Sequence, residues 1–236
     1  MMARGPDWLQ RLPRPIRTGH RGAAGLVPAN TLASYSEAVR LGCDLIEVDV
    51  QLTADGTLVL RHDSDILVEG KHRPVVSLTL HELRWADPDV PTLAEALTLL
   101  RDRAVPLLDL KGTGFENQLG AAVRDAGMER AIVCGRPLSS LMATHAANSA
   151  IATSLTFDGR QLDGVDAALV EAIPTDIVTV SYRWLTTRII DLFHASGLLV
   201  LAWTVDDPKA MRDLVATGVD GITTNRPDLL IAQFPR

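Results

Sequence analysis

The chain has 236 residues, of which 47% are hydrophobic and 22% are charged. These values are ordinary for a globular protein and exclude the disordered and fibrous classes. The net charge of −6 argues against a nucleic-acid binder, which usually carries a basic face, but an anionic substrate is not excluded, because a bound cation can set the local field.

Short apolar runs alternate with amphipathic helical stretches along the chain, and this alternation indicates βα units around a parallel sheet. The expected strands are residues 16–20, 45–50, 105–111, 131–135, 151–157, 176–181, 198–204 and 219–224. Eight strands close a β/α barrel. We therefore predict an α/β fold, a single (β/α)8 TIM-barrel domain over residues 1–236, with a small insertion at about residues 64–91 after the second strand.

Helix signals fall between the strands. Asn30 is expected to cap a helix over residues 31–41, which Gly42 ends. Two further helices are expected to start at capping boxes, Thr79 with Glu82 and Thr92 with Glu95.

A ninth apolar run, residues 57–62, follows the second strand after a linker too short for a parallel crossover. The Asp-Gly pair at 55–56 is a strong signal for a two-residue hairpin turn. Counting outward from this turn places Asp49 opposite His62, and Glu47 shares their face because side chains alternate along a strand. We therefore expect these three side chains to lie together.

Polar side chains gather at the C-terminal ends of the expected strands, where β/α barrels carry their active sites. Glu47, Asp49 and Asp109 would point into one mouth, and their mutual repulsion favours a bound cation. Oxygen ligands suit Mg²⁺ or Ca²⁺ better than zinc. The alternative is a charge network in which Arg21 and Lys111 neutralise the acids. Acids alternating along an apolar strand are costly to bury without a function, so we favour the metal site.

Two histidines near these acids suit proton transfer, because histidine titrates near neutral pH. Either His20 or His62 alone would be better explained as a hydrogen-bonded core residue, but the pair beside three acids favours catalysis. Arg21 and Lys111 are typical donors to phosphate. Trp203 belongs either to the barrel core or to the wall of the substrate pocket, and we favour the wall.

The N-terminal 17 residues lack the apolar stretch of a secretory signal, and no apolar run reaches the roughly 18 residues of a membrane span. Cys43 and Cys134 lie in apolar runs and are expected to be free buried thiols in a reducing compartment. We therefore expect a cytoplasmic protein without stable membrane insertion. The sequence leaves the oligomeric state open.

Taken in order, these motifs resemble the glycerophosphodiester phosphodiesterase family over about residues 17–227. The specific set is His20-Arg21-Gly22, Asn30-Thr31, residues 42–50, residues 53–56 and His62-Asp63. Weaker matches follow at Pro91-Thr92-Leu93, residues 109–111, Trp203 and residues 218–223.

The resemblance implies a barrel that hydrolyses small glycerophosphodiesters to glycerol 3-phosphate and an alcohol, with Mg²⁺ or Ca²⁺ as cofactor. In the implied mechanism the glycerol 2-hydroxyl attacks phosphorus while one histidine protonates the leaving alcohol, and water then opens the cyclic phosphate with the roles reversed. The implied roles are general acid/base catalysis for His20 and His62, metal binding for Glu47, Asp49 and Asp109, and binding of phosphoryl oxygens for Arg21 and Lys111.

The sequence departs from the family pattern at two positions. Asp109 stands where the family commonly has Glu, and its shorter side chain leaves open a water-mediated contact or a different cation. Ala29 replaces the acid that usually precedes Asn30-Thr31, which removes an expected partner for Arg21 or for a nearby group.

Two alternative functions remain at this stage. A lysophospholipase D would need an apolar groove beside the site, for which the candidates are Ile66, Leu67, Val75 and Val76. A non-catalytic barrel would bind a phosphodiester or a metal without turnover. An aromatic content of 4% and the short insertion favour a small polar substrate, whose leaving alcohol the sequence does not define.

Overall fold

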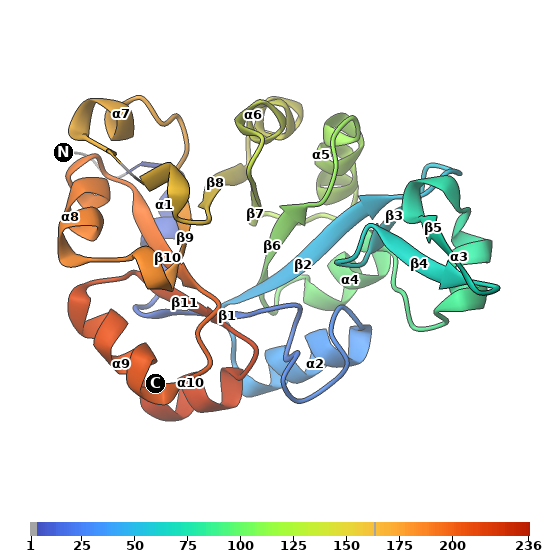
Figure 1. The fold of residues 1–236 in the computed structure, drawn as a ribbon, viewed down its shortest axis with the longest axis horizontal. Helices are drawn as coiled ribbons and strands as arrows, with labels where there is room; N and C mark the ends of the chain where they lie inside the picture. The colour runs from blue at the N-terminus through green and yellow to red at the C-terminus, as the bar shows by residue number, and fades with distance from the viewer. Residues whose placement is uncertain (1–3, 163) are drawn as a thin grey trace.

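A computed structural model describes residues 4–162 and 164–236; residues 1–3 and 163, which the predicted domain includes, lie outside it. Parallel strands pair in the order β1-β11-β10-β9-β8-β7-β6-β2, and a β1–β2 pairing closes the circle. Within the described residues these are the eight strands of a (β/α)8 barrel, which confirms the predicted fold (Figure 1). Their bounds are β1 Ile16–Gly19, β2 Leu45–Leu52, β6 Val105–Leu110, β7 Ala131–Gly135, β8 Ile151–Phe157, β9 Ile177–Ser181, β10 Leu199–Trp203 and β11 Gly221–Thr224.

The described residues form ten α-helices, most of which surround this barrel on its outer face (Figure 1). The exceptions are the helix over Asp7–Gln10, which packs at the end that holds the strand N-termini, and the helix over Leu80–Ala86, which lies in the segment after β2. Most of the ten follow a strand, as the βα alternation predicts. They are α1 Asp7–Gln10, α2 Leu32–Leu41, α3 Leu80–Ala86, α4 Leu93–Leu100, α5 Glu116–Asp125, α6 Leu138–Ala147, α7 Ala167–Glu171, α8 Thr187–Ala195, α9 Pro208–Thr217 and α10 Pro227–Gln233. Both expected capping boxes are present, at the starts of α3 and α4. No helix among the described residues is long and apolar enough to span a bilayer.

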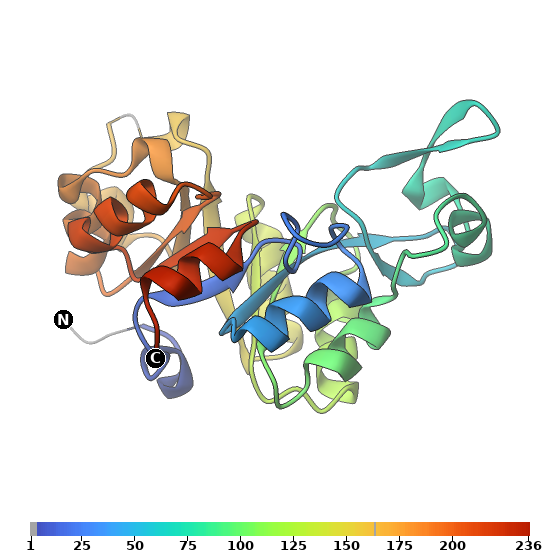
Figure 2. The same ribbon diagram turned by 90° about the horizontal axis from the view of Figure 1, so that it is seen from below.

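The segment between β2 and α4 leaves the barrel and carries β3 (Leu58–Leu60), β4 (Asp65–Val68), β5 (Lys71–Pro74) and α3. The β4–β5 hairpin projects away from the barrel (Figure 2). This segment has a small apolar cluster of its own, separate from the apolar clusters of the barrel. Its buried members are Val59, Ile66, Val75, Leu78, Leu83 and Val90.

The turn between β2 and β3 differs from the predicted one. Val50 pairs with Leu60, so Asp49 lies opposite Arg61 rather than His62, and the predicted register was wrong by one residue. The loop has three residues, because Thr53 and Thr57 close it and Gly56 alone takes the left-handed conformation (φ 78°). The Asp55 carboxylate instead accepts bonds from the Thr53 hydroxyl and from the backbone N–H at the start of α3.

The start of α2 also differs from prediction. Thr31, not Asn30, is the N-cap, and its side chain accepts the Ser34 N–H at 3.1 Å. Asn30 has a left-handed backbone (φ 55°), which turns its side chain toward the barrel instead of the helix. Asn30, which was expected from the sequence to cap the helix, therefore bonds the Asp49 carboxylate instead.

The end of the barrel that holds the strand N-termini is closed by an apolar plug. Leu9 of α1 is fully buried against inward-facing side chains that include Ile16, Leu45 and Leu199, each at or near the start of its strand. Because apolar side chains fill this end, the polar residues of a functional site are expected at the opposite end, where the strands have their C-termini.

We expect Leu9→Ala to lower the free energy of unfolding by about 2–5 kcal/mol, because it leaves a cavity in this plug. Urea unfolding measures the change. Leu169→Ala is the matched control, since Leu169 is 54% exposed on α7 and its truncation should change stability by less than about 0.5 kcal/mol. Equal effects of the two substitutions would contradict the plug.

Candidate active site

The loop after β1 begins the site. Arg21 has a left-handed backbone (φ 52°), and Gly22 follows at φ 84°, where a Cβ atom would lie 2.4 Å from the Ser34 hydroxyl. That hydroxyl donates to the Arg21 carbonyl at 2.8 Å and fixes the loop on α2. This conformation points the Arg21 N–H at the Glu47 carboxylate, 2.7 Å away.

Three carboxylates gather beside this loop, as the sequence predicts. Asp49 of β2 and Asp109 of β6 are register partners on adjacent strands, and Glu47 lies two residues earlier on β2. One carboxylate oxygen from each residue lies within 4.8 Å of the others. The shorter side chain of Asp109 therefore still reaches the cluster.

Two cationic side chains neutralise part of this charge, so the charge network that we considered as the alternative is present. Lys111 Nζ lies 2.8 Å from Asp49 Oδ1 and also pairs with Asp109, while Arg21 Nε lies 3.2 Å from Asp49 Oδ2. Burial opposes ionisation of Asp49, but Lys111, together with Asn30 and Arg21, holds its pKa below the usual value. Burial raises the pKa of Asp109, against the effect of Lys111.

The negative charge of Glu47 is compensated in a different way. It is buried, and among the described residues its carboxylate is bonded by the Arg21 backbone N–H and has no ion-pair partner. Burial, together with the charges of Asp49 and Asp109, raises the pKa of Glu47 well above its usual value. Three acids face two cationic side chains, and a hard divalent cation with oxygen ligands fits the remaining charge. The buried acidic cluster can therefore hold a metal ion.

Asn30 fixes one of these acids. Its side-chain amide nitrogen donates to Asp49 Oδ2 at 2.6 Å, and the Tyr35 hydroxyl donates to Asn30 Oδ1 at 3.0 Å. At the neighbouring position Ala29 brings no carboxylate, and Arg21 pairs with Asp49 instead. The Arg21 guanidinium therefore has an ion-pair partner although Ala29 provides none.

His20 is oriented from the last strand. Its Nδ1 lies 2.7 Å from Asn225 Oδ1. The Asn225 amide nitrogen donates to Asp206 at 2.7 Å, and its backbone N–H donates to the same carboxylate at 2.8 Å. The amide oxygen must therefore face His20, so Nδ1 carries a proton and the neutral ring keeps Nε2 free as a proton acceptor. Burial lowers the pKa of His20, and the bond to Asn225 opposes this shift.

His62 reaches the acidic cluster from the segment after β3, whereas His20 reaches it from the end of β1. Strand β3 ends at Leu60, so the chain has left the ladder at His62 and its side chain reaches the mouth in spite of the changed register. Its Nδ1 lies 2.8 Å from the Asp63 carboxylate, and this bond lowers the pKa of Asp63. The side chain is 43% exposed.

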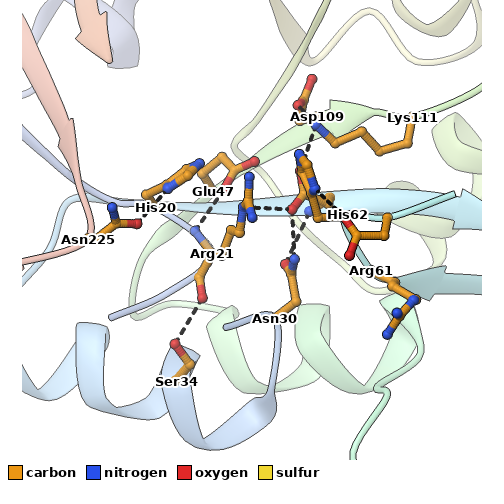
Figure 3. Close-up of polar contacts among 12 residues, drawn as sticks. His20, Arg21, Asn30, Ser34, Glu47, Arg61, His62, Asp109, Lys111 and Asn225 are labelled. Atoms are coloured by element: carbon orange, nitrogen blue, oxygen red, sulfur yellow. Dashed lines mark hydrogen bonds and ion pairs between the residues drawn. The ribbon is translucent and has the colours of Figure 1, made fainter. Parts of the chain in front are cut away.

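A cavity of about 520 Å³ joins these groups at the C-terminal ends of the strands. Figure 3 shows how the side chains approach one another from β1, β2, β6 and the segment after β3. The predicted site residues that line the cavity are His20, Arg21, Glu47, His62, Asp109, Lys111 and Trp203. Trp203 thus lies in the wall, as favoured, while Asp49 is buried behind Arg21 and Lys111.

Three further residues were not identified from the sequence as parts of the site. Cys134 was predicted only as a buried thiol; it is free and buried, but it also lines the cavity, as the register partner of Asp109 on the adjacent strand. Asn225 was noted only as part of a polar strand end, and Asp206 was not singled out. Their position after β10 and β11 is the signal that could have identified them.

Comparison with known proteins gives a consistent result. Residues 20–229 match the model of the glycerophosphoryl diester phosphodiesterase family. The chain belongs to this family. A glycerophosphodiester phosphodiesterase from Caldanaerobacter subterraneus is 30% identical, over 90% of this chain and 94% of the relative. The sequence-based assignment to a family of phosphodiester hydrolases is therefore confirmed.

Solved structures agree. The crystal structure of glycerophosphodiester phosphodiesterase from Agrobacterium tumefaciens has a TM-score of 0.75 at 26% identity, covering 91% of this chain and 98% of that one. An Oleispira antarctica phosphodiesterase, in complex with its product sn-glycerol-3-phosphate, has a TM-score of 0.81 at 22% identity, covering 97% and 99%. At 22% identity, the likeness to the Oleispira phosphodiesterase shows a shared fold alone.

We expect Asn225→Ala to lower the pKa of His20 further, because the substitution removes the bond that favours the protonated ring. The other charged groups that affect His20 are Arg21, Asp49 and Lys111, and the substitution leaves them in place. Titration of the His20 ring by NMR in both proteins measures the shift, with the His145 ring, which bonds the Ile151 carbonyl, as internal control. An unchanged or raised pKa of His20 would contradict the assigned bond.

Proposed function

We propose that the protein hydrolyses small glycerophosphodiesters to glycerol 3-phosphate and an alcohol, with a divalent cation as cofactor and His20 and His62 as the acid/base pair. The observation that carries this proposal is one cavity with His20 and His62 around a buried acidic cluster, with Arg21 and Lys111 beside it. A phosphodiester needs these three elements: proton transfer on two sides, positive charge at phosphorus, and a fixed orientation. Membership of the family supports the same activity.

Glu47, Asp49 and Asp109 would hold the cation, which supplies positive charge that polarises a phosphoryl oxygen and a substrate hydroxyl. The ion could be Mg²⁺ or Ca²⁺, since both accept three carboxylate ligands. Arg21 and Lys111 already face the acids and would turn their remaining donors to the phosphoryl oxygens.

The two histidines take different parts in the first step. His20 has a lowered pKa and a free Nε2, so it suits the base that removes the proton from the attacking 2-hydroxyl of the glycerol. His62 has its Nδ1 on Asp63, which leaves Nε2 to protonate the leaving alcohol. The cyclic phosphate is then opened by water, which His62 deprotonates while His20 returns its proton to the 2-oxygen.

The lysophospholipase alternative lacks the groove it needs. Ile66 and Val75 are buried in the apolar cluster of the insertion, and Leu67 and Val76 are exposed to solvent. None of these four residues lines the cavity. The position of the four apolar residues therefore favours a small polar substrate.

We expect chelation to abolish release of glycerol 3-phosphate from glycerophosphocholine and from glycerophosphoglycerol, and addition of Mg²⁺ or Ca²⁺ to restore it. Glu47→Gln should lower kcat/KM at least about 100-fold, because it removes a negatively charged ligand at the least compensated position. Glu37→Gln is the matched control on the outer face of α2, where Glu37 pairs with Arg40. Activity that is indifferent to chelator would remove the cation from the proposal.

His20→Ala and His62→Ala should each lower kcat about 10²–10⁴-fold without loss of fold, since each removes one proton-transfer group. His72→Ala serves as control, because His72 is 73% exposed on the β4–β5 hairpin. Steady-state kinetics with circular dichroism measures both effects. Turnover unchanged in both catalytic variants would overturn the assigned roles, and a wild-type protein that binds diesters without turnover would indicate the non-catalytic barrel.

A further inference from the structure

The proposed mechanism uses one side of the cavity and leaves the wall formed by β8, β9, β10 and β11 without a role. We infer that Thr223 and Trp203 in this wall form a hydroxyl-binding subsite, which takes a free hydroxyl of a polyol group in the bound phosphodiester. This inference rests on the proposed function and specifies which part of the substrate the second wall recognises.

Charge divides the cavity into two unlike walls. The ends of β1, β2, β6 and β7 and the segment after β3 supply the charged and titratable side chains, from His20 to Arg136. The residues that β8–β11 contribute are uncharged: Thr156, Thr179, Trp203 and Thr223. These strands lie on the opposite side of the barrel from β2 and β6 (Figure 1). A phosphoryl group is drawn to the charged wall, so the neutral part of the diester faces the other.

Two polar atoms in the neutral wall lack partners. Thr223 is 3% exposed, and neither its Oγ1 nor the Trp203 Nε1 has a hydrogen-bond partner among the described residues. The neighbouring Thr179 hydroxyl, by contrast, bonds Ser154. Buried hydroxyl and indole N–H groups are normally paired, because an unpaired one loses its bonds to water. A cavity wall is where a ligand can supply the missing partner.

The kind of partner follows from the two atoms. Trp203 Nε1 can only donate, whereas Thr223 Oγ1 can donate and accept. A substrate hydroxyl satisfies both, since it accepts from the indole and exchanges a bond with threonine. A trimethylammonium group has neither a donor nor an acceptor and would leave both atoms unpaired. The subsite therefore fits a polyol rather than a choline group.

Thr18 provides a matched control. It is the register partner of Thr223 across β1 and β11, it is fully buried, and its Oγ1 is also unpaired among the described residues. It does not line the cavity. Thr18→Val and Thr223→Val thus remove the same group from two buried neighbours, of which only Thr223 lines the cavity.

The first test compares the affinity of glycerol 3-phosphate with that of n-propyl phosphate, which lacks both hydroxyls, by calorimetry in the presence of Mg²⁺. Thr223→Val should weaken glycerol 3-phosphate about 3- to 10-fold, the range of one net hydrogen bond, and leave n-propyl phosphate unchanged. Trp203→Phe should act in the same way, and Thr18→Val should alter neither ligand. Melting temperatures of the variants show that each is folded. Equal weakening of both ligands, or no weakening of glycerol 3-phosphate, would overturn the subsite.

The second test identifies which half of the diester is recognised. If Thr223→Val lowers kcat/KM equally for glycerophosphocholine and glycerophosphoglycerol, the subsite takes the glycerol that both share. A loss confined to glycerophosphoglycerol places the leaving alcohol there. No loss on either substrate would count against the inference. A wild-type protein that hydrolyses neither would refute the proposed function, whereas the affinity comparison would still decide the subsite.

Discussion

Three carboxylates at one end of a barrel, two of them buried, repel one another, and the rest of the site is arranged around this repulsion. In a low-dielectric environment each negative charge must be compensated by cations, by hydrogen bonds or by a proton. The structure gives Asp49 the fullest compensation, from Lys111, Arg21 and Asn30. Glu47 has the least, a single backbone N–H. The left-handed backbone of Arg21 in the loop after β1 directs its N–H at the Glu47 carboxylate.

His20 and Asp49 are each held by a residue from a different element. Asn225 after β11 orients His20, and Asp206 after β10 orients Asn225. Asn30 before α2 orients Asp49 on β2. Reacting groups must be held within a fraction of an ångström, and hydrogen bonds from a rigid scaffold provide this more precisely than a loop alone. The supporting residues are short amides and carboxylates, whose few rotamers suit the task.

The sequence was sufficient to predict the barrel and most of the site, because these depend on patterns with a strong physical basis. The eight strands follow from apolar runs, the starts of α3 and α4 from reciprocal capping, and the gathering of Glu47, Asp49 and Asp109 from the rule that strand ends meet at one rim. The register of β3 was not predictable in the same way. Asp55-Gly56 suits a two-residue turn, but the bonds of Asp55 to Thr53 and to the start of α3 favour a three-residue loop. The second of these bonds joins residues 25 positions apart in the chain, which no local rule includes. Asn30 shows the same limit, since its local chemistry suits a cap while its tertiary partner is Asp49.

The distribution of charge around the rim explains how one cavity can treat the two parts of a phosphodiester differently. Charged groups come from β1, β2, β6 and β7, whereas β8–β11 contribute hydroxyls and an indole. With a divalent cation among its acids, the charged wall would attract the phosphoryl group strongly but distinguish poorly among attached alcohols, because Coulomb attraction depends little on direction. Hydrogen bonds to neutral groups are weaker and more directional, and an unmatched partner leaves a buried donor unpaired. Affinity for the anion and selection of the alcohol can therefore be assigned to opposite sides of the barrel.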